Sequence, residues 1–312
     1  MRISIAMATY NGEEYLEEQL ISFLSQTRHP DELVVCDDCS SDKTTEILKS
    51  FSARSPFEVR IYKNDQNLGF LKNFEKALSL VDGDWVALSD QDDVWLPNKL
   101  EVLESTALKD KKALVITHDK FVANGQLEVQ SETHMELLSA ANSKNVRMIA
   151  GCATFLRANF LSTVLPIPSS AKAHDVWIHS LAHRISGARR HVDVPLLIYR
   201  RHQSNSSRAY EFSGQHVSRL GRLLYYRSPE RKIEYASRLE NLYIMRERLC
   251  RFLGHDAGSL DREISAFDAR GRIINFRFPN RQIMAVKALV NGDYFLFEGW
   301  YSFFRDFFTF KG

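Results

Sequence analysis

The chain has 312 residues, of which 44% are hydrophobic and 26% are charged, and its formal net charge is +2. This length allows one large domain with an appendage or two domains, and the composition is that of an ordinary globular protein. No apolar run approaches the roughly 20 residues that span a bilayer, which argues against a membrane-spanning protein. Met1 and Arg2 lead directly into a strand-like run, so we expect no signal peptide.

The charge is unevenly distributed along the chain. Residues 213–312 hold 17 Lys and Arg against 11 Asp and Glu, a net charge of +6, whereas residues 1–212 hold 24 against 28, a net charge of −4. An acidic first part suits a metal site. A basic second part suits an anionic partner such as phospholipid, lipid diphosphate or nucleic acid. Of these we expect a lipid surface and no nucleic acid.

The four cysteines are Cys36, Cys39, Cys152 and Cys250. Their spacing gives no disulfide framework, which favours a reducing, cytoplasmic compartment. Cys36 and Cys39 form a C-x-x-C pair, but zinc would need a second pair of ligands. The two acids between the thiols would also raise the thiol pKa values, which disfavours a redox role.

Short apolar runs alternate with stretches of helical spacing through the first third of the chain. Strands are predicted at 3–8, 33–36, 57–62 and 85–88, and helices at 13–26, 43–51, 70–80 and 97–109. This alternation is typical of parallel β-α-β units. In such sheets, ligands bind beyond the carboxyl ends of the strands.

The pattern changes after residue 110. We predict a strand at 113–117, a hairpin at 118–128 around a two-residue Asn-Gly turn, a helix at 174–185, a strand at 190–199 and a polar loop at 203–215. Gly151 lies among small residues that let the backbone approach a ligand. From about residue 216 the chain has helical spacing, including 219–226 and 233–253. We therefore predict domains at 1–212 and 213–312.

The segment 294–310 is unusually rich in aromatic residues. Aromatics with nearby Arg and Lys suit a helix that lies on a bilayer surface. The same residues also suit a helix that packs back onto the protein. The sequence leaves both alternatives open.

Polar clusters follow three of the predicted strands. They are Thr9-Tyr10-Asn11, Asp37-Asp38 and the acidic group Asp90, Asp92 and Asp93. Three crowded carboxylates repel one another unless a cation lies among them, and oxygen ligands favour Mg²⁺ or Mn²⁺. The alternative is a solvated acidic turn before a helix that has Pro97 in its first turn.

Four motifs resemble a known family. IAMATYN at 5–11, LVVCDDCSSD at 33–42, NLGFLKNF at 67–74 and LSDQDDVWLPNKL at 88–100 are similar to family 2 glycosyltransferases with the GT-A fold. The resemblance covers roughly residues 1–205. The last motif resembles the rhamnosyltransferase-like branch of bacterial polysaccharide biosynthesis. The resemblance implies an α/β fold, with a mostly parallel, Rossmann-like sheet flanked by helices and a C-terminal helical extension.

The resemblance implies a nucleotide site at the first two polar clusters. Thr9, Tyr10 and Asn11 would line the donor pocket. Asp38 would bond the N–H edge of the base, with support from Asp37. Lys72 would face the base or the diphosphate, so these six residues are assigned to donor binding. The alternative for the two aspartates is that they cap the following helix.

Further roles follow from the resemblance for five positions. Asp90 would contact the donor sugar, Gly151 would lie in the glycine loop, Asp92 and His202 would hold Mg²⁺ or Mn²⁺, and Asp175 would be the catalytic base. Asp175 could instead cap a helix, and His202 could belong to a basic surface patch with Arg200 and Arg201. Asp93 is assigned to helix capping or support of the site.

The sequence departs from the family pattern at two places. Cys39 replaces a glycine in the Asp-Asp-Gly-Ser turn, and His174 replaces an acid before Asp175. The first departure bears on the backbone of that turn, and the second bears on contacts with the acceptor.

The implied function is an inverting, metal-dependent glycosyltransferase at the cytoplasmic face of the membrane. Its donor would be dTDP-rhamnose or a UDP-sugar such as UDP-hexose or UDP-N-acetylhexosamine, and its acceptor a glycan or lipid-linked oligosaccharide. The alternatives are a nucleotidyltransferase and a non-catalytic binder of nucleotide sugars. The former is disfavoured by the acidic Glu13 and Glu14 where a basic phosphate loop is expected.

Overall fold

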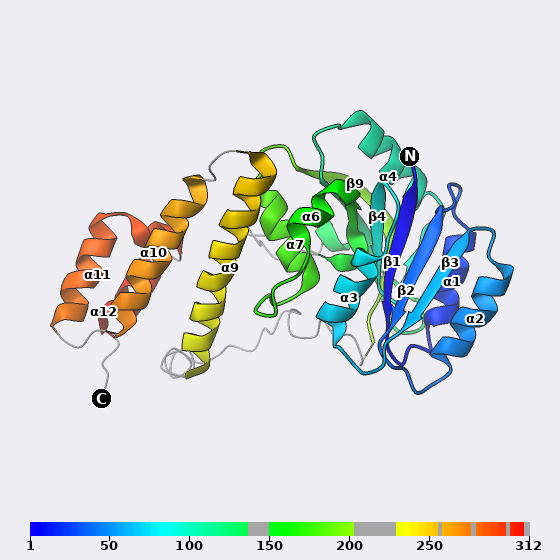
Figure 1. Ribbon diagram of the computed structural model, residues 1–312, viewed down its shortest axis with the longest axis horizontal. Helices are drawn as coiled ribbons and strands as arrows, with labels where there is room; N and C mark the ends of the chain where they lie inside the picture. The colour runs from blue at the N-terminus through cyan, green and yellow to red at the C-terminus, as the bar shows by residue number, and fades with distance from the viewer. Residues whose placement is uncertain (137–149, 203–228, 255–257, 276–278, 298–299, 309–312) are drawn as a thin grey trace. The chain divides into compact units, whose positions relative to one another are not determined.

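The computed structural model describes residues 1–136, 150–202, 229–254, 258–275, 279–297 and 300–308 (Figure 1). The chain divides into two compact units, one of residues 1–167 and 172–208 and the other of residues 168–171 and 209–312. The division near residue 208 lies four residues before the predicted boundary. The predicted loop 203–215 and the predicted helix 219–226 fall outside the described residues.

The first unit contains the described strands and eight of the described helices. Its strands are β1 (Ile3–Thr9), β2 (Glu32–Asp37), β3 (Glu58–Lys63), β4 (Trp85–Ser89), β5 (Val94–Trp95), β6 (Val115–Ala123), β7 (Val129–Thr133), β8 (Thr154–Arg157) and β9 (Arg189–Arg200). Its helices are α1 (Leu16–Leu24), α2 (Thr44–Arg54), α3 (Phe70–Ser79), α4 (Lys99–Lys109), η1 (Gly151–Ala153), η2 (Ala158–Phe160), α6 (Leu161–Val164) and α7 (His174–His183).

All nine strands belong to one sheet of order β3-β2-β1-β4-β8-β6-β9-β5, with β7 paired to β6. The first four strands in this order are parallel, and β6 is parallel to β9. The pairs β4–β8, β6–β8, β5–β9 and β6–β7 are antiparallel. The predicted α/β class is therefore confirmed, with a sheet that is parallel in its first half and mixed in its second.

The central strands form because their side chains are apolar on both faces. Every residue of β2 and β4 is buried, as are Ile3, Ile5 and Met7 of β1. Full burial of one such side chain stabilises the fold by about 1.5–3 kcal/mol. These strands and the helices beside them form the main core, which also includes Phe23, Trp95 and Phe155.

The connections of the parallel strands place the helices on both faces of the sheet. The chain runs outward from β1 through β2 to β3 and then returns past β1 to β4. Right-handed crossovers therefore put α1 and α2 on one face and α3 on the other, where α7 packs beside it (Figure 1). The direction reverses between β1 and β4. Ligands bind at the carboxyl ends of the strands that flank such a reversal.

Two local predictions were wrong. The short strand β5 was not anticipated, because Val94 and Trp95 are too few residues to give a strand pattern. The hairpin between β6 and β7 does not turn at two residues, since Ala123 pairs with Val129 and leaves five residues in the loop. Leu127 in this loop has a positive φ of 61°, a conformation more often taken by glycine.

Cys39 has a φ of 66°, so it takes the left-handed conformation in which glycine is least strained. This is the turn where the family resemblance expects glycine. The turn is therefore kept at Cys39, although a residue with a side chain takes the left-handed conformation there.

The second unit is helical over its described residues. Its elements are α9 (Pro229–Leu253), α10 (Gly258–Asn275), α11 (Asn280–Val290), η4 (Asp293–Leu296) and α12 (Trp300–Phe308). A small core contains Ile273, Ala285, Ala288, Tyr294 and Phe303. No helix among the described residues is long and apolar enough to cross a membrane.

Part of the aromatic C-terminal segment packs back within this unit. Tyr294 and Phe303 are buried, and their ring centroids are 5.6 Å apart. Asp306 of α12 forms a buried ion pair with Arg270 of α10, with Nε and Oδ2 2.6 Å apart. Packing thus accounts for one side of α12.

Candidate active site

The loop between β4 and β5 carries the three predicted carboxylates and lies at the reversal point of the sheet. It is tied to the end of β1 by two hydrogen bonds with Gln91. The Tyr10 amide donates to Gln91 Oε1 at 2.8 Å, and Gln91 Nε2 donates to the Tyr10 carbonyl at 3.0 Å. A Cβ atom on Gly12 would lie 2.4 Å from Gln91 Oε1, so glycine leaves room for the Gln91 amide in this position. The predicted convergence of the strand ends is therefore present.

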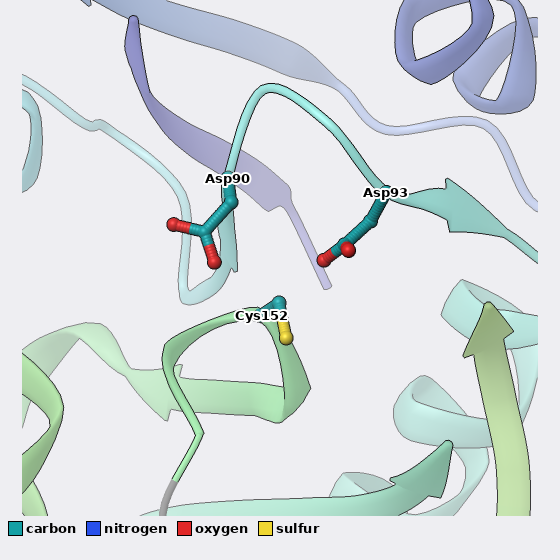
Figure 2. Close-up of side chains that lie close together, drawn as sticks. All are labelled: Asp90, Asp93 and Cys152. Atoms are coloured by element: carbon teal, nitrogen blue, oxygen red, sulfur yellow. The ribbon is translucent and has the colours of Figure 1, made fainter. Parts of the chain in front are cut away.

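Asp90 and Asp93 lie at the two ends of this loop, and Cys152 of η1 faces them (Figure 2). One ligand atom of each residue lies within 4.8 Å of the other two. Burial raises the pKa of Asp90 well above its usual value, and the charges of Asp92 and Asp93 raise it further. Crowding and burial thus disfavour full ionisation of this group of acids without a counter-charge.

Asp93 is buried within the site, whereas the sequence indicated only a supporting or helix-capping residue. It is fully buried, and burial followed by the charge of Asp92 raises its pKa to about 7. Its Oδ1 accepts a hydrogen bond from the Arg200 amide at 3.2 Å. Among the described residues its Oδ2 has no hydrogen-bond partner.

Asp92 and His202 are brought together as predicted for two ligands of one ion. His202 Nε2 lies 2.8 Å from Asp92 Oδ2, although 110 residues separate the two. The His202 ring also packs against Tyr15, the residue before α1, with ring centroids 4.6 Å apart. The alternative in which Arg200 and His202 form a surface patch is wrong for Arg200, which is 2% exposed.

The donor atoms at this position fit a hard divalent cation. The carboxylate of Asp92 suits Mn²⁺ or Mg²⁺, and the imidazole nitrogen of His202 lies 2.8 Å from it. The orphaned Oδ2 of Asp93 lies buried beside them. Cys152 is a poor candidate ligand, because burial raises the pKa of its thiol well above the usual value and a neutral thiol binds metal weakly.

Thr9 and Asp37 lie side by side at the ends of β1 and β2. Thr9 Oγ1 donates to Asp37 Oδ1 at 3.0 Å, and the Ser40 amide donates to Asp37 Oδ2 at 3.0 Å. Asp37 is fully buried, so its carboxylate organises the turn that follows β2. The structure thus gives Asp37 a supporting position, and any contact with the donor stays a prediction.

Asp38 holds the segment that precedes α3. Its Oδ1 accepts hydrogen bonds from Asn64 Nδ2 at 2.8 Å and from the Leu68 amide at 2.7 Å. Its Oδ2 accepts one from the Gly69 amide at 2.8 Å. A carboxylate has about four acceptor positions, so one remains for a ligand. The predicted bond to a nucleotide base is compatible with this arrangement but is not tested by it.

Tyr10 and Asn11 extend beyond the end of β1 and are both exposed. Asn11 has a φ of 44°, and its Oδ1 accepts a hydrogen bond from the Ser41 amide at 2.9 Å. Lys72 differs from the other predicted donor-binding residues. Its Nζ donates to Glu75 and to the Ile167 carbonyl, each at 2.8 Å, so the structure directs it toward these groups. The structure brings Tyr10 and Asn11 to the site edge but does not bring Lys72 to the carboxylates.

Asp175 lies in the first turn of α7, next to the carboxylate cluster. The preceding residue, His174, packs against Gly151, which adjoins Cys152 of the cluster, and the charge of Asp175 contributes to the raised pKa of Asp90. Asp175 Oδ1 accepts a hydrogen bond from the Val176 amide at 2.7 Å. Among the described residues, none forms a hydrogen bond with Asp175 Oδ2. Asp175 can therefore cap its helix with one oxygen and accept a proton with the other.

Gly151 and His174 pack against each other beside Asp175. A Cβ atom on Gly151 would lie 2.7 Å from His174 Nε2, so only glycine leaves room for this imidazole. The imidazole stacks on Phe74 with centroids 3.9 Å apart, and burial lowers its pKa. Gly151 thus leaves room for the first turn of α7 to lie against η1.

Two buried lysines near the acids were missed by sequence reasoning. Lys120 of β6 lies 3.9 Å over the Tyr199 ring, and its charge lowers the pKa values of Asp90 and Asp93. Lys99 of α4 donates from Nζ to the Cys152 carbonyl at 2.8 Å. Four consecutive polar residues in β6 were an available signal for the first, because the rest of that strand is apolar. Nothing in the local sequence marks Lys99 as buried.

Lys99 gives a pH-dependent prediction. Burial lowers its pKa from 10.5 to about 7 in the folded protein. Between pH 7 and pH 10.5 the unfolded chain therefore binds more protons than the folded protein, and the free energy of unfolding rises with pH. Relative to Lys99→Met, the wild-type free energy of unfolding should increase by up to about 4 kcal/mol from pH 7 to 10. Urea unfolding at each pH measures this difference, with exposed Lys109→Met as the control. A pH-independent difference between wild type and Lys99→Met would contradict it.

A family model described as Glycosyl transferase family 2 matches residues 4–165. The chain therefore belongs to glycosyl transferase family 2. The matched region includes the ends of β1, β2 and β4, and it stops before Asp175 and His202.

Individual proteins are also similar to this chain. The dTDP-rhamnosyl transferase RfbG of Shigella flexneri is 26% identical over 245 residues, which is 74% of this chain and 84% of RfbG. The UDP-Glc:alpha-D-GlcNAc-diphosphoundecaprenol beta-1,3-glucosyltransferase WfgD of Escherichia coli is 32% identical over 125 residues, which is 40% of this chain and 48% of WfgD. With five other curated relatives, the match spans only 27–40% of their own length.

The solved structures include S. aureus TarS, residues 1–349, in complex with UDP. It superposes with a TM-score of 0.56 and 16% identity, and the match covers 98% of this chain and 89% of that chain. At this level of identity the likeness establishes a shared fold. The predicted GT-A fold is confirmed by this match together with the family model.

Proposed function

We propose that this protein transfers a sugar from a nucleoside-diphosphate donor to a hydroxyl group of a glycan or lipid-linked acceptor. The proposed reaction depends on Mg²⁺ or Mn²⁺, inverts the anomeric carbon and belongs to polysaccharide biosynthesis. The observation that carries the proposal is the position of Asp175 beside the carboxylates of the β4–β5 loop in a family 2 chain. One group can then take a proton while the others hold the donor.

The chemistry of the proposed reaction assigns separate tasks to these residues. An acceptor hydroxyl is a weak nucleophile at neutral pH, and a carboxylate within hydrogen-bond reach can take its proton as the new bond forms. Asp175 would do this through Oδ2, because its Oδ1 accepts a hydrogen bond from the Val176 amide. Direct displacement with one base needs no covalent enzyme intermediate, so the anomeric configuration inverts.

Asp92 and His202 would hold the cation, with Asp90 toward the donor sugar. When bound, the cation would neutralise negative charge on the departing diphosphate without any proton transfer. The protein would contribute by holding Asp92 and His202 2.8 Å apart in a partly buried site, where electrostatic interactions are stronger than in water.

We propose rhamnose as the donor sugar, with a UDP-sugar such as UDP-glucose as the alternative. The match with a dTDP-rhamnosyl transferase covers 74% of this chain, whereas the match with a UDP-glucose-dependent enzyme covers 40%. Bound donor stabilises the fold in proportion to its affinity. A thermal-shift screen of nucleotide sugars with Mn²⁺ therefore tests the choice, and transfer assays with the donors that bind test the activity. Turnover of no donor across a broad acceptor panel would refute the proposed function.

We also propose contact with an anionic membrane surface through α11. Ile283, Val286 and Val290 repeat at helical spacing and are 52%, 44% and 80% exposed, although the opposite face of α11 is buried in the unit core. Lys287 is exposed next to them. An apolar face with a basic residue, in a region of net charge +6, suits an interface with acidic phospholipid.

The membrane prediction concerns this exposed face. Changing Ile283, Val286 and Val290 to serine together should release the protein from phosphatidylglycerol liposomes, since each side chain contributes about 1 kcal/mol of apolar transfer. Cosedimentation measures the bound fraction. Tyr243→Ser is the matched control, because Tyr243 of α9 is 48% exposed but lies on another helix. Failure of the wild-type protein to pellet with these liposomes would refute the membrane contact.

A further inference from the structure

Arg200 ends β9 two residues before His202, and its side chain is almost completely buried. A buried guanidinium is costly unless its N–H groups are hydrogen-bonded and its charge is paired. The contacts of Arg200 therefore indicate what it does, and they are directed at the loop that carries Asp92 and Asp93.

The guanidinium joins three segments that are distant in the sequence. Its Nε donates to the main-chain carbonyl of Asp92 at 2.8 Å, and Nη1 donates to the Gly125 carbonyl at 2.7 Å. Its Nη2 forms an ion pair with Glu18 of α1. The Arg200 amide also donates to Asp93 Oδ1 at 3.2 Å.

Arg200 bonds the carbonyl of Asp92 and not its carboxylate. The ion pair with Glu18 balances the positive charge, so Arg200 does not compete with a cation for the Asp92 side chain. That side chain is left to meet His202 at 2.8 Å. The Tyr15 ring packs against both residues, at 4.5 Å from the guanidinium carbon of Arg200 and 4.6 Å from the imidazole centroid.

We infer that Arg200 is a positioning residue that fixes the main chain of Asp92, so that Asp92 and His202 present one preformed pair of ligands to a divalent cation. This inference rests on the proposed metal-dependent function. A role in binding the donor diphosphate is disfavoured, because the described contacts of the guanidinium are made to protein groups and 2% of the residue is exposed. The role depends on the shape of the guanidinium, since a lysine ammonium cannot reach three divergent acceptors at once.

The test is Mn²⁺ binding measured by isothermal titration calorimetry on the full chain, once with dTDP present and once with UDP present. Arg200→Met and Arg200→Lys should each raise the Mn²⁺ dissociation constant by roughly 10–100-fold, as is typical when a partner that orients a metal ligand is lost. Arg201→Met is the matched control, because Arg201 is the exposed neighbour and should leave the constant unchanged. Circular dichroism establishes that each variant is folded, and Arg200→Lys carries the test if Arg200→Met does not fold.

A second readout separates positioning from a general loss of structure. The Mn²⁺ concentration that gives half-maximal transfer should rise in both Arg200 variants, while kcat at saturating Mn²⁺ stays within about threefold of wild type. Mn²⁺ binding by Arg200→Lys at wild-type strength would overturn the positioning role and leave the proposed function intact. Absence of Mn²⁺ binding by the wild-type protein would instead overturn the proposed metal dependence, and with it the role of Arg200.

Discussion

Replacing Asp175 with asparagine should lower kcat for sugar transfer by roughly 10²–10⁴-fold, which is the usual contribution of a general base. Asparagine keeps the size of the side chain, and its carbonyl oxygen can still accept the hydrogen bond that the Val176 amide gives to Asp175 Oδ1 at 2.7 Å. The start of α7 should therefore be preserved. What is lost is the oxygen that takes the proton from the acceptor hydroxyl.

The expected signature of Asp175→Asn is a loss of turnover without a loss of donor binding. Initial rates with saturating donor and acceptor measure kcat, and calorimetric titration with donor and Mn²⁺ measures binding, which should stay within a few-fold of wild type. Asp193→Asn is the control, because the Asp193 side chain is 91% exposed on β9. Normal transfer by the Asp175 variant would show that this residue is only the cap of α7.

The parts of the fold that the sequence predicted are those with local signals. Apolar runs such as residues 85–88 are buried strands, and the polar residues after them lie at one edge of the sheet. The antiparallel half was harder, because a short apolar run does not encode the direction of its partner. The two residues of β5 gain their strand character only from pairing with Ile198 and Leu197 of β9.

The candidate site likewise contains residues that the sequence predicted and residues that only the tertiary structure reveals. Asp92 and His202 could be paired from the family resemblance, and the structure places their side chains in contact. Arg200 could not, because its bond partners Gly125 and Glu18 lie 75 and 182 residues away. A charged residue that is satisfied by tertiary contacts looks the same in a sequence as one that lies in solvent.

Tertiary packing also bears on the two alternatives for the aromatic segment, a membrane surface or packing within the protein. The number of aromatic residues in a sequence does not reveal which of their side chains are buried. Tyr294 and Phe303 are buried in the second unit, whereas Phe295 and Phe304 are 65% and 50% exposed. The exposed apolar face with regular helical spacing lies on α11, which sequence composition alone did not single out.

Replacing Asp92 with asparagine should reduce transfer by at least about 10²-fold at fixed Mn²⁺, because metal neutralisation of a leaving diphosphate is worth several kcal/mol and each 1.4 kcal/mol is about tenfold. The amide keeps a group within reach of His202 but removes the negative charge that binds the cation. Asp65→Asn is the control, since Asp65 is an exposed acid outside the cluster.

The decisive comparison is between Asp92→Asn and wild type after chelation. If Asp92 acts through the cation, the wild-type rate in excess EDTA should fall to the rate of the variant, and EDTA should change the variant little. Because His202 would bind the same ion, Asp92→Asn combined with His202→Ala should lose little more than the stronger single variant. Additive losses would mean that the two residues act separately, despite the 2.8 Å between them. Wild-type activity that survives complete chelation would show that the carboxylates of this loop bind the donor without a metal.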